Sequence, residues 1–194
     1  MAFLQWLDHL DKDLFVLVRH GASRFQDTIM PWLRNPYTWV PLYAFMFYFA
    51  FRAGKRHAWV FIVLSLATFA ITDSITAQLL KPMFGRLRPC HNAEMQAVLH
   101  GLVDCGGLYS MPSNHAANHF GLAAFWYFSL RAMTGRKWWW LWVWAALICY
   151  AQVYVGKHYP FDVCVGAVFG TLVGYGMSRL FIYWLRQRGR AQAQ

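Results

Sequence analysis

Charged residues are scarce in this chain of 194 residues: they make up 13% of the sequence, against 58% hydrophobic and 19% aromatic residues. An average soluble domain has about 25% charged residues. Because a soluble domain of this length still needs a wettable surface, the shortage excludes an ordinary soluble globule. The aromatic content excludes intrinsic disorder, and the presence of only four cysteines excludes a small disulfide-rich scaffold. The composition therefore predicts a membrane protein.

Acidic residues are scarcer still: 8 Asp and Glu stand against 18 Lys and Arg, so the formal net charge is +10. A nucleic-acid binder would gather its basic residues in one patch or stripe. Here the basic residues are split between short clusters that separate apolar segments, so we expect no nucleic-acid partner. The N-terminus lacks the basic start and uninterrupted apolar stretch of a cleavable signal peptide, which predicts insertion through internal segments.

Hydrophobic periodicity divides the chain into an N-terminal helix and five candidate membrane spans. Residues 1–20 place apolar side chains at helical spacing opposite several aspartates, which predicts an amphipathic helix in the membrane interface. With the turn that follows, this segment covers residues 1–36. Five apolar stretches then approach the roughly 20 residues that a span needs. They are 37–51, 58–80, 115–130, 138–155 and 161–185.

These segments predict one all-α integral membrane domain over 1–194, with a transmembrane core at 37–186 and a cytoplasmic tail at 187–194. The basic links 52–56 and 131–137 contain no acidic residue, and neither does the tail. The positive-inside rule assigns all three to the cytoplasm. We therefore expect a multi-pass protein of a bacterial plasma membrane whose segments 81–114 and 156–160 face the periplasm.

The outward segments hold three groups of polar residues that can meet at one membrane face. They are Lys81, Arg86 and Arg88 after the second span, Ser113, Asn114 and His115 at the start of the third, and Lys157, His158 and Asp162 at the start of the fifth. Free N–H groups at a helix N-terminus bind phosphate, and an arginine fork can hold it through two hydrogen bonds. The three groups together predict an oxyanion site.

The residue types at this face also fit phosphoryl transfer. Asp162 can reach back to one nitrogen of His158 and leave the other nitrogen free as a nucleophile. His115 has no acidic neighbour in sequence and is available as a general acid near neutral pH. Because basic side chains can neutralise the phosphate charge, we expect no metal and no other cofactor.

The three groups resemble the signature motifs of the type 2 phosphatidic acid phosphatase superfamily of membrane lipid phosphatases. The first motif, Lys, six residues and Arg-Pro, matches 81–89. The second, Pro-Ser-Gly-His, matches 112–115 with Asn114 in the glycine position. The third, Ser-Arg, five residues, His, three residues and Asp, matches 151–162 with Ala151 and Gln152 in place of Ser-Arg.

This resemblance implies that His158 is the nucleophile, Asp162 its orienting partner and His115 the acid for the leaving group. It also implies a phosphate-binding set, which we extend with neighbouring polar residues to Lys81, Arg88, Ser113, Asn114, Lys157, Gln152 and Arg86. Gln152 cannot supply the charge of the family's arginine, and we expect Lys157 to compensate as a point charge. Arg86 matches no motif position, so its role is open between support of the site and structure.

The resemblance further implies metal-independent dephosphorylation of a membrane lipid. A polyprenyl diphosphate such as undecaprenyl diphosphate is the favoured substrate, with phosphatidylglycerophosphate or phosphatidate beside it. Lipid A phosphatase and lipid-to-lipid phosphotransferase are alternatives. An alternative of another class is a catalytically weak protein that binds or transports lipid phosphates. The expected partners are the substrate and membrane lipids, and the oligomeric state is left open.

Three residues outside the motifs also carry expectations. Asp73, within the second span beside Thr72, is expected to join a buried polar network. Cys90 and Cys105 both lie in the outward segment, where an oxidising compartment favours a disulfide.

Overall fold

The computed structural model describes residues 2–99 and 101–191, and all of the regular secondary structure within them is helical. The long helices are α1 (Ala2–His20), α2 (Arg24–Arg34), α3 (Val40–Ala53), α4 (Lys55–Ser74), α7 (Asn114–Thr134), α8 (Trp140–Tyr154) and α9 (Pro160–Ala191). Short elements lie between them: the 3-10 helices η1 (Pro36–Trp39) and η3 (Pro89–His91), the π-helix η2 (Ile75–Leu80), α5 (Lys81–Phe84) and α6 (Ala93–Gln96). The all-α prediction is confirmed.

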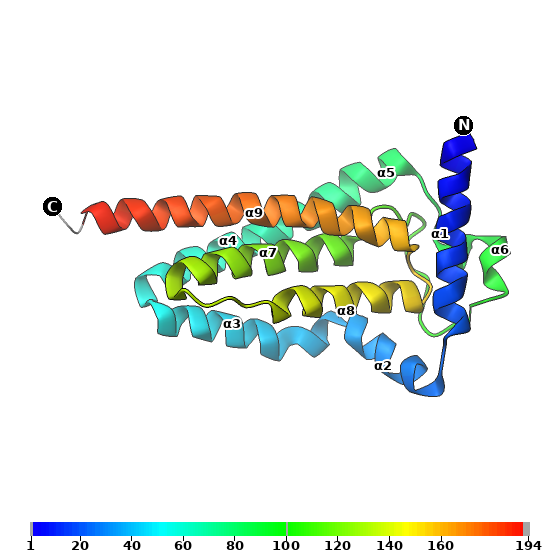
Figure 1. Ribbon diagram of the computed structural model, residues 1–194, viewed down its shortest axis with the longest axis horizontal. Helices are drawn as coiled ribbons and strands as arrows, with labels where there is room; N and C mark the ends of the chain where they lie inside the picture. The colour runs from blue at the N-terminus through cyan, green and yellow to red at the C-terminus, as the bar shows by residue number, and fades with distance from the viewer. Residues whose placement is uncertain (1, 100, 192–194) are drawn as a thin grey trace.

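Figure 1 shows how the helices are arranged: α3, α4, α7, α8 and α9 run along the long axis of the molecule, whereas α1 lies across one end. At that end α9 begins, and the backbone N–H of Phe161 in its first turn donates to Asp11 of α1 over 2.9 Å. The described part of α9 ends at the opposite end of the bundle. A crosswise orientation is the one expected of an interfacial helix.

Two helical stretches are long and apolar enough to cross a membrane, His57–Phe84 and Pro160–Arg188, and α8 is apolar but shorter. Several large apolar side chains on these stretches face outward; Trp59 and Leu172, for example, are 65% and 66% exposed. Apolar side chains on the outside of a helix suit a lipid surrounding. The other two predicted spans form α3 and α7, while the number of spans stays a prediction. The segment predicted as a tail from 187 continues α9 as far as Ala191.

The close contact between α7 and α9 places the second and third motifs side by side. Gly recurs at every fourth position of α9 over 166–174, which puts these residues on one face of the helix. A Cβ at Gly166 would overlap the carbonyl oxygen of Ser113, and a Cβ at Gly170 would overlap that of Ala117. The two backbones therefore touch, as small residues allow between helices.

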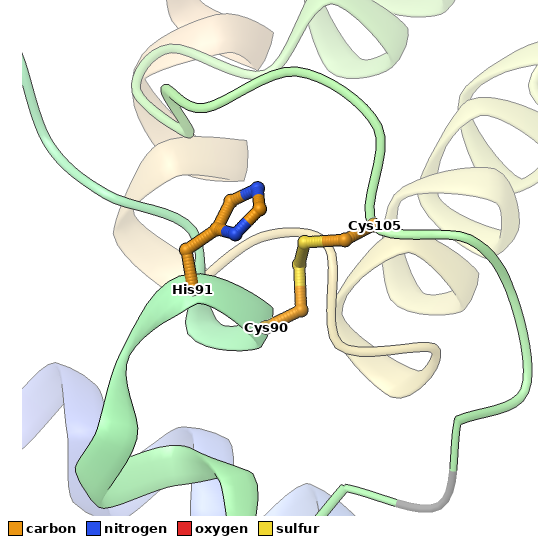
Figure 2. Close-up of side chains that lie close together, drawn as sticks. All are labelled: Cys90, His91 and Cys105. Atoms are coloured by element: carbon orange, nitrogen blue, oxygen red, sulfur yellow. A yellow bond between two sulfur atoms is a disulfide. The ribbon is translucent and has the colours of Figure 1, made fainter.

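The segment between α5 and α7 is closed by the predicted disulfide between Cys90 and Cys105, whose Cα atoms are 5.9 Å apart. Figure 2 shows the two cysteines joined beside His91. Because both sulfur atoms are used in the bond, this group offers no thiolate to a metal ion. The disulfide holds Cys105 next to Pro89, where the first motif ends.

Candidate active site

The basic residues of the first motif are held by the disulfide-closed segment. Lys81 donates to the carbonyl oxygens of Tyr109 and Ser110 over 3.0 and 3.1 Å. Arg88 donates from Nε to the carbonyl of Tyr109 over 3.2 Å and from a terminal nitrogen to that of Cys105 over 2.8 Å. These bonds fix the direction of both side chains and leave part of each cationic group free for a ligand.

Lys157 lies next to Arg88 across the same segment. The position that a Cβ would take at Gly106 lies 3.4 Å from Lys157 Nζ and 3.7 Å from an Arg88 terminal nitrogen, so both cations contact this turn. The φ of +71° at Gly106 is what favours glycine there. Burial, aided by the charges of Arg34 and Arg88, lowers the pKa of Lys157 to about 8. A partly buried group of cations at neutral pH attracts an anion.

The second motif begins α7 as predicted. Ser113 is the fully buried N-cap, and its hydroxyl oxygen accepts from the N–H of Ala116 over 3.4 Å. Its own backbone N–H donates to the carbonyl oxygen of Asp162 over 3.0 Å. The starts of α7 and α9 therefore lie side by side, and the N–H groups of two helix N-termini converge near the third motif.

Asn114, a candidate phosphate ligand, is turned toward α4 instead. Its side-chain nitrogen donates to the Asp73 carboxylate over 3.0 Å, and that of Asn118 donates to the same oxygen over 2.9 Å. Thr72 in turn donates to the amide oxygen of Asn118 over 2.7 Å. The polar network expected around Asp73 is confirmed. Because the side-chain nitrogen of Asn114 donates to Asp73, it is not available to donate to a phosphate.

His158 and Asp162 face each other at the start of α9. His158 Nδ1 and the nearer Asp162 oxygen are 3.7 Å apart, which is too long for a hydrogen bond. The other neighbours of Asp162 fix it firmly: one oxygen accepts from the N–H of Tyr159 over 2.8 Å and the other from Arg86 over 3.0 Å. Burial lowers the pKa of His158 to about 4, although Asp162 opposes the shift, so the imidazole is neutral at pH 7.

Arg86 is held by three carboxylates rather than left free for a phosphate. Its terminal nitrogens lie 3.0 Å from Asp8, 2.6 Å from Asp11 and 3.0 Å from Asp162. Its guanidinium also stacks over Tyr159, 4.2 Å from the ring centroid. Burial alone would lower the pKa of Arg86, but these carboxylates outweigh it and raise that pKa. This geometry corrects the phosphate-binding assignment: Arg86 supports Asp162 from behind.

The sequence reasoning missed the role of Asp8 and Asp11, which it treated only as the polar face of an interfacial helix. Asp11 is fully buried and accepts from both Arg86 and the start of α9. Aspartates spaced by three residues do share a helix face, but nothing in that spacing identifies a partner at residue 86. Through these two residues α1 is tied to the carboxylate that faces His158.

His115 lies in the first turn of α7, where it borders a cavity of about 430 Å³ between α3, α4 and α7. Most of the lining is apolar, from Tyr43, Phe47, Leu66, Phe69, Leu122 and Trp126 among others. Two contacts fix the ring of His119, one turn further along α7. Its Nδ1 is hydrogen-bonded to the His115 carbonyl oxygen over 2.7 Å, and its Nε2 lies 3.3 Å from the Tyr43 hydroxyl. Both histidines line the cavity, but the two ring nitrogens of His119 are engaged in these structural contacts.

Gln152, in the position of the family's arginine, is fully buried on α8. Neither its amide oxygen nor its amide nitrogen has a hydrogen-bond partner within the described residues. Buried polar groups are nearly always paired. Two unpaired polar atoms therefore lie buried within the third motif.

A family model described as the PAP2 superfamily matches residues 58–186, a range that contains all three motifs. The chain belongs to this superfamily. A lipid A 4'-phosphatase of Bacteroides thetaiotaomicron is 31% identical over 89% of this chain and 77% of its own length. An undecaprenyl-diphosphatase of Sulfolobus acidocaldarius is 27% identical over 84% of this chain and 74% of its own.

The fold agrees with the same assignment. A transmembrane PAP2 type phosphatidylglycerolphosphate phosphatase from Bacillus subtilis superposes with a TM-score of 0.71 at 18% identity, covering 90% of this chain and 85% of that one. The predicted resemblance is confirmed, and with it the enzyme class: this PAP2 protein is a phosphate-ester hydrolase with the membrane fold of its superfamily.

Proposed function

We propose that this PAP2 protein removes phosphate from a membrane lipid through a phosphohistidine on His158. The observation that carries the proposal is the neutral, buried imidazole whose Nδ1 faces a fixed carboxylate, at a face that also holds Lys81, Arg88 and Lys157. Because Nδ1 faces Asp162, the lone pair on Nε2 is the one available for attack.

The proposed reaction has two in-line steps. In the first, Nε2 of His158 forms a bond to phosphorus while the bond from phosphorus to the leaving oxygen breaks, and that oxygen takes a proton from His115. In the second, water attacks the same phosphorus, gives its proton to His115 and breaks the phosphorus–nitrogen bond. Lys81, Arg88, Lys157 and the helix N-terminus at Ser113 stabilise the phosphate oxygens throughout, a role for which no metal is needed.

The cavity beside His115 supports a lipid as the substrate. A hydrocarbon chain gains free energy when it leaves water for an apolar space, and here the apolar lining reaches the general acid itself. We propose that the cavity takes the part of the lipid adjoining its phosphate. Since the relative named for lipid A is more similar to this chain than the one named for undecaprenyl diphosphate, we place a lipid A phosphate first and a polyprenyl diphosphate second.

We further propose the predicted topology: five spans, α1 in the interface and the site on the periplasmic side. The crosswise α1 at the end of the bundle that holds the site, and the end of α9 at the other, support this orientation. The basic links 52–56 and 131–137 then face the cytoplasm together with the C-terminus.

The test is a phosphate-release panel with the purified protein in detergent and EDTA. Lipid A, undecaprenyl diphosphate, phosphatidylglycerophosphate and phosphatidate are compared at equal concentration. We expect release from at least one of them, with lipid A foremost. Retained lipid binding without release would favour the binding or transport alternative, and transfer of labelled phosphate to a second lipid would identify a phosphotransferase.

Replacement of Lys157 by alanine tests whether this residue compensates for Gln152. Lys157 is charged below its pKa of about 8 and neutral above it, so phosphate affinity should fall as the pH rises through 8. Arg34, Arg88 and Asp104 are the charges that act on it. We expect Lys157→Ala to lower kcat/KM about tenfold at pH 7 and to weaken the fall in kcat/KM as the pH rises through 8. Burial also lowers the pKa of Lys81 to about 8, so part of that fall should remain. Lys137→Ala, in an exposed link, is the control; unchanged kcat/KM in Lys157→Ala would refute compensation.

A further inference from the structure

Lys157 can replace the charge of the family's arginine at Gln152 but not its bidentate fork, and the packing of α2 bears on where such a fork comes from. Gln152 is fully buried with both amide atoms unpaired within the described chain. An amide can bond a phosphate oxygen but cannot neutralise it. A phosphate bound next to Gln152 therefore needs a cation from another residue. Because it assumes a phosphate at this position, the inference rests on the proposed function.

Helix α2 packs on α8 beside Gln152. Buried Met30 of α2 lies in one apolar cluster with Ala151 and Tyr154, the close neighbours of Gln152. One turn earlier, Asp27 accepts a hydrogen bond from the Tyr154 hydroxyl over 2.7 Å. Positions 27, 30 and 34 share one face of a helix. The face of α2 that contacts this end of α8 is therefore the face that carries Arg34.

Arg34 ends α2 as a partly buried arginine without a partner. Its Nε is buried and unbonded, and in the part of the chain that the structure describes no carboxylate lies within salt-bridge distance of its guanidinium. Pro36, two residues further on, lines the cavity that His115 borders. A buried guanidinium with no counter-ion is costly unless an anion joins it.

We infer that Arg34 is a phosphate-binding residue that supplies, from α2, the guanidinium missing at position 152. Its fork can hold two phosphate oxygens, which a lysine cannot do. The charge of Arg34 acts on both Arg88 and Lys157, so the three cations lie near one another. A cation at the C-terminus of a helix can also serve the helix alone, by interacting with the dipole; that role would affect stability but not phosphate affinity.

The experiment compares Arg34→Gln and Arg34→Lys with Arg24→Gln, which removes an exposed charge from the other end of the same helix. In phosphate release from the preferred lipid, Arg34→Gln should lower kcat/KM about 10- to 100-fold, Arg34→Lys should lose less, and Arg24→Gln should stay within about twofold of the wild type. Adding Gln152→Arg to Arg34→Gln should restore part of the loss. Wild-type kcat/KM in Arg34→Gln, or a stable double variant without any recovery, would overturn the inference.

Binding of inorganic phosphate, measured by calorimetry in detergent, separates this inference from the proposed function. Weaker phosphate binding in Arg34→Gln than in Arg24→Gln, at equal melting temperature, supports Arg34 even if the wild type releases phosphate from no lipid. Equal phosphate binding in the two variants overturns the inference even if lipid hydrolysis is confirmed. A lower melting temperature of Arg34→Gln with unchanged phosphate affinity would assign the residue to α2 alone.

Discussion

Replacing His158 by alanine is expected to lower phosphate release from the preferred lipid by at least about 10³-fold, because no other described side chain can replace the nucleophile. The protein should still fold, since the imidazole makes no hydrogen bond through Nδ1 and the turn around it is held by the backbone of Tyr159 and by Asp162. His20→Ala, at the exposed end of α1, is the matched control. Activity of His158→Ala within tenfold of the wild type would overturn the proposed mechanism.

The pH profile gives a second measure of the same residue. Since burial lowers the pKa of His158 to about 4, the nucleophile is unprotonated over the whole neutral range. Protonation of His158 should therefore lower kcat/KM only as the pH falls toward 4. An unfolded histidine takes up its proton near pH 6.5. The unfolded state therefore binds more protons between pH 6.5 and 4, so the free energy of unfolding should decrease as the pH falls through that window. This decrease should be smaller in His158→Ala.

The parts of the site that sequence reasoning predicted are those encoded locally. The start of the third span at Ser113, the start of the fifth beside His158 and the pairing of Cys90 with Cys105 follow from residue type and local position. The facing of His158 and Asp162 follows from a spacing of one helical turn. In each case the information lies within a few residues or in the compartment that a segment faces.

The parts that it could not predict depend on contacts between distant segments. Arg86 has three anionic partners, and two of them, Asp8 and Asp11, lie more than 70 positions away on a helix that carries no motif. The position of Arg34 depends in the same way on how α2 packs against α8. Charge alone could not distinguish these residues from ordinary interfacial ones, because interfacial helices commonly carry both signs. Only the packed structure shows that Asp8 and Asp11 of α1 contact Arg86 and the start of α9.

These contacts give the N-terminal segment two separate connections to the chemistry. Through Asp8, Asp11 and Arg86, α1 fixes the carboxylate opposite His158, and in our inference α2 contributes a phosphate ligand through Arg34. The family model begins at residue 58, after both helices. The matched range therefore contains all three motifs and neither of these two helices.

Replacing Gly170 by valine should have the second largest effect, because it acts on the contact that brings two motifs together. A Cβ at Gly170 would overlap the backbone of Ala117, so α7 and α9 must separate. Overpacking of this kind costs about 1–3 kcal/mol, and a shift of about 1 Å in a catalytic group can cost about 10²-fold in rate. We expect kcat/KM to fall about 100-fold, together with a lower melting temperature in detergent.

Gly176→Val is the matched control for Gly170→Val, because it makes the same change in helix propensity on the same helix at a position where a Cβ would meet nothing within 4 Å. It should retain most of the wild-type activity. Since Gly170 touches neither His158 nor any phosphate ligand, a loss confined to Gly170→Val can come only from the spacing of α7 and α9. Equal loss of activity in both variants would show that the spacing of α7 and α9 does not set the positions of Ser113 and His115 relative to His158. The hydrogen bond from the Ser113 N–H to the Asp162 carbonyl would then have to fix these positions.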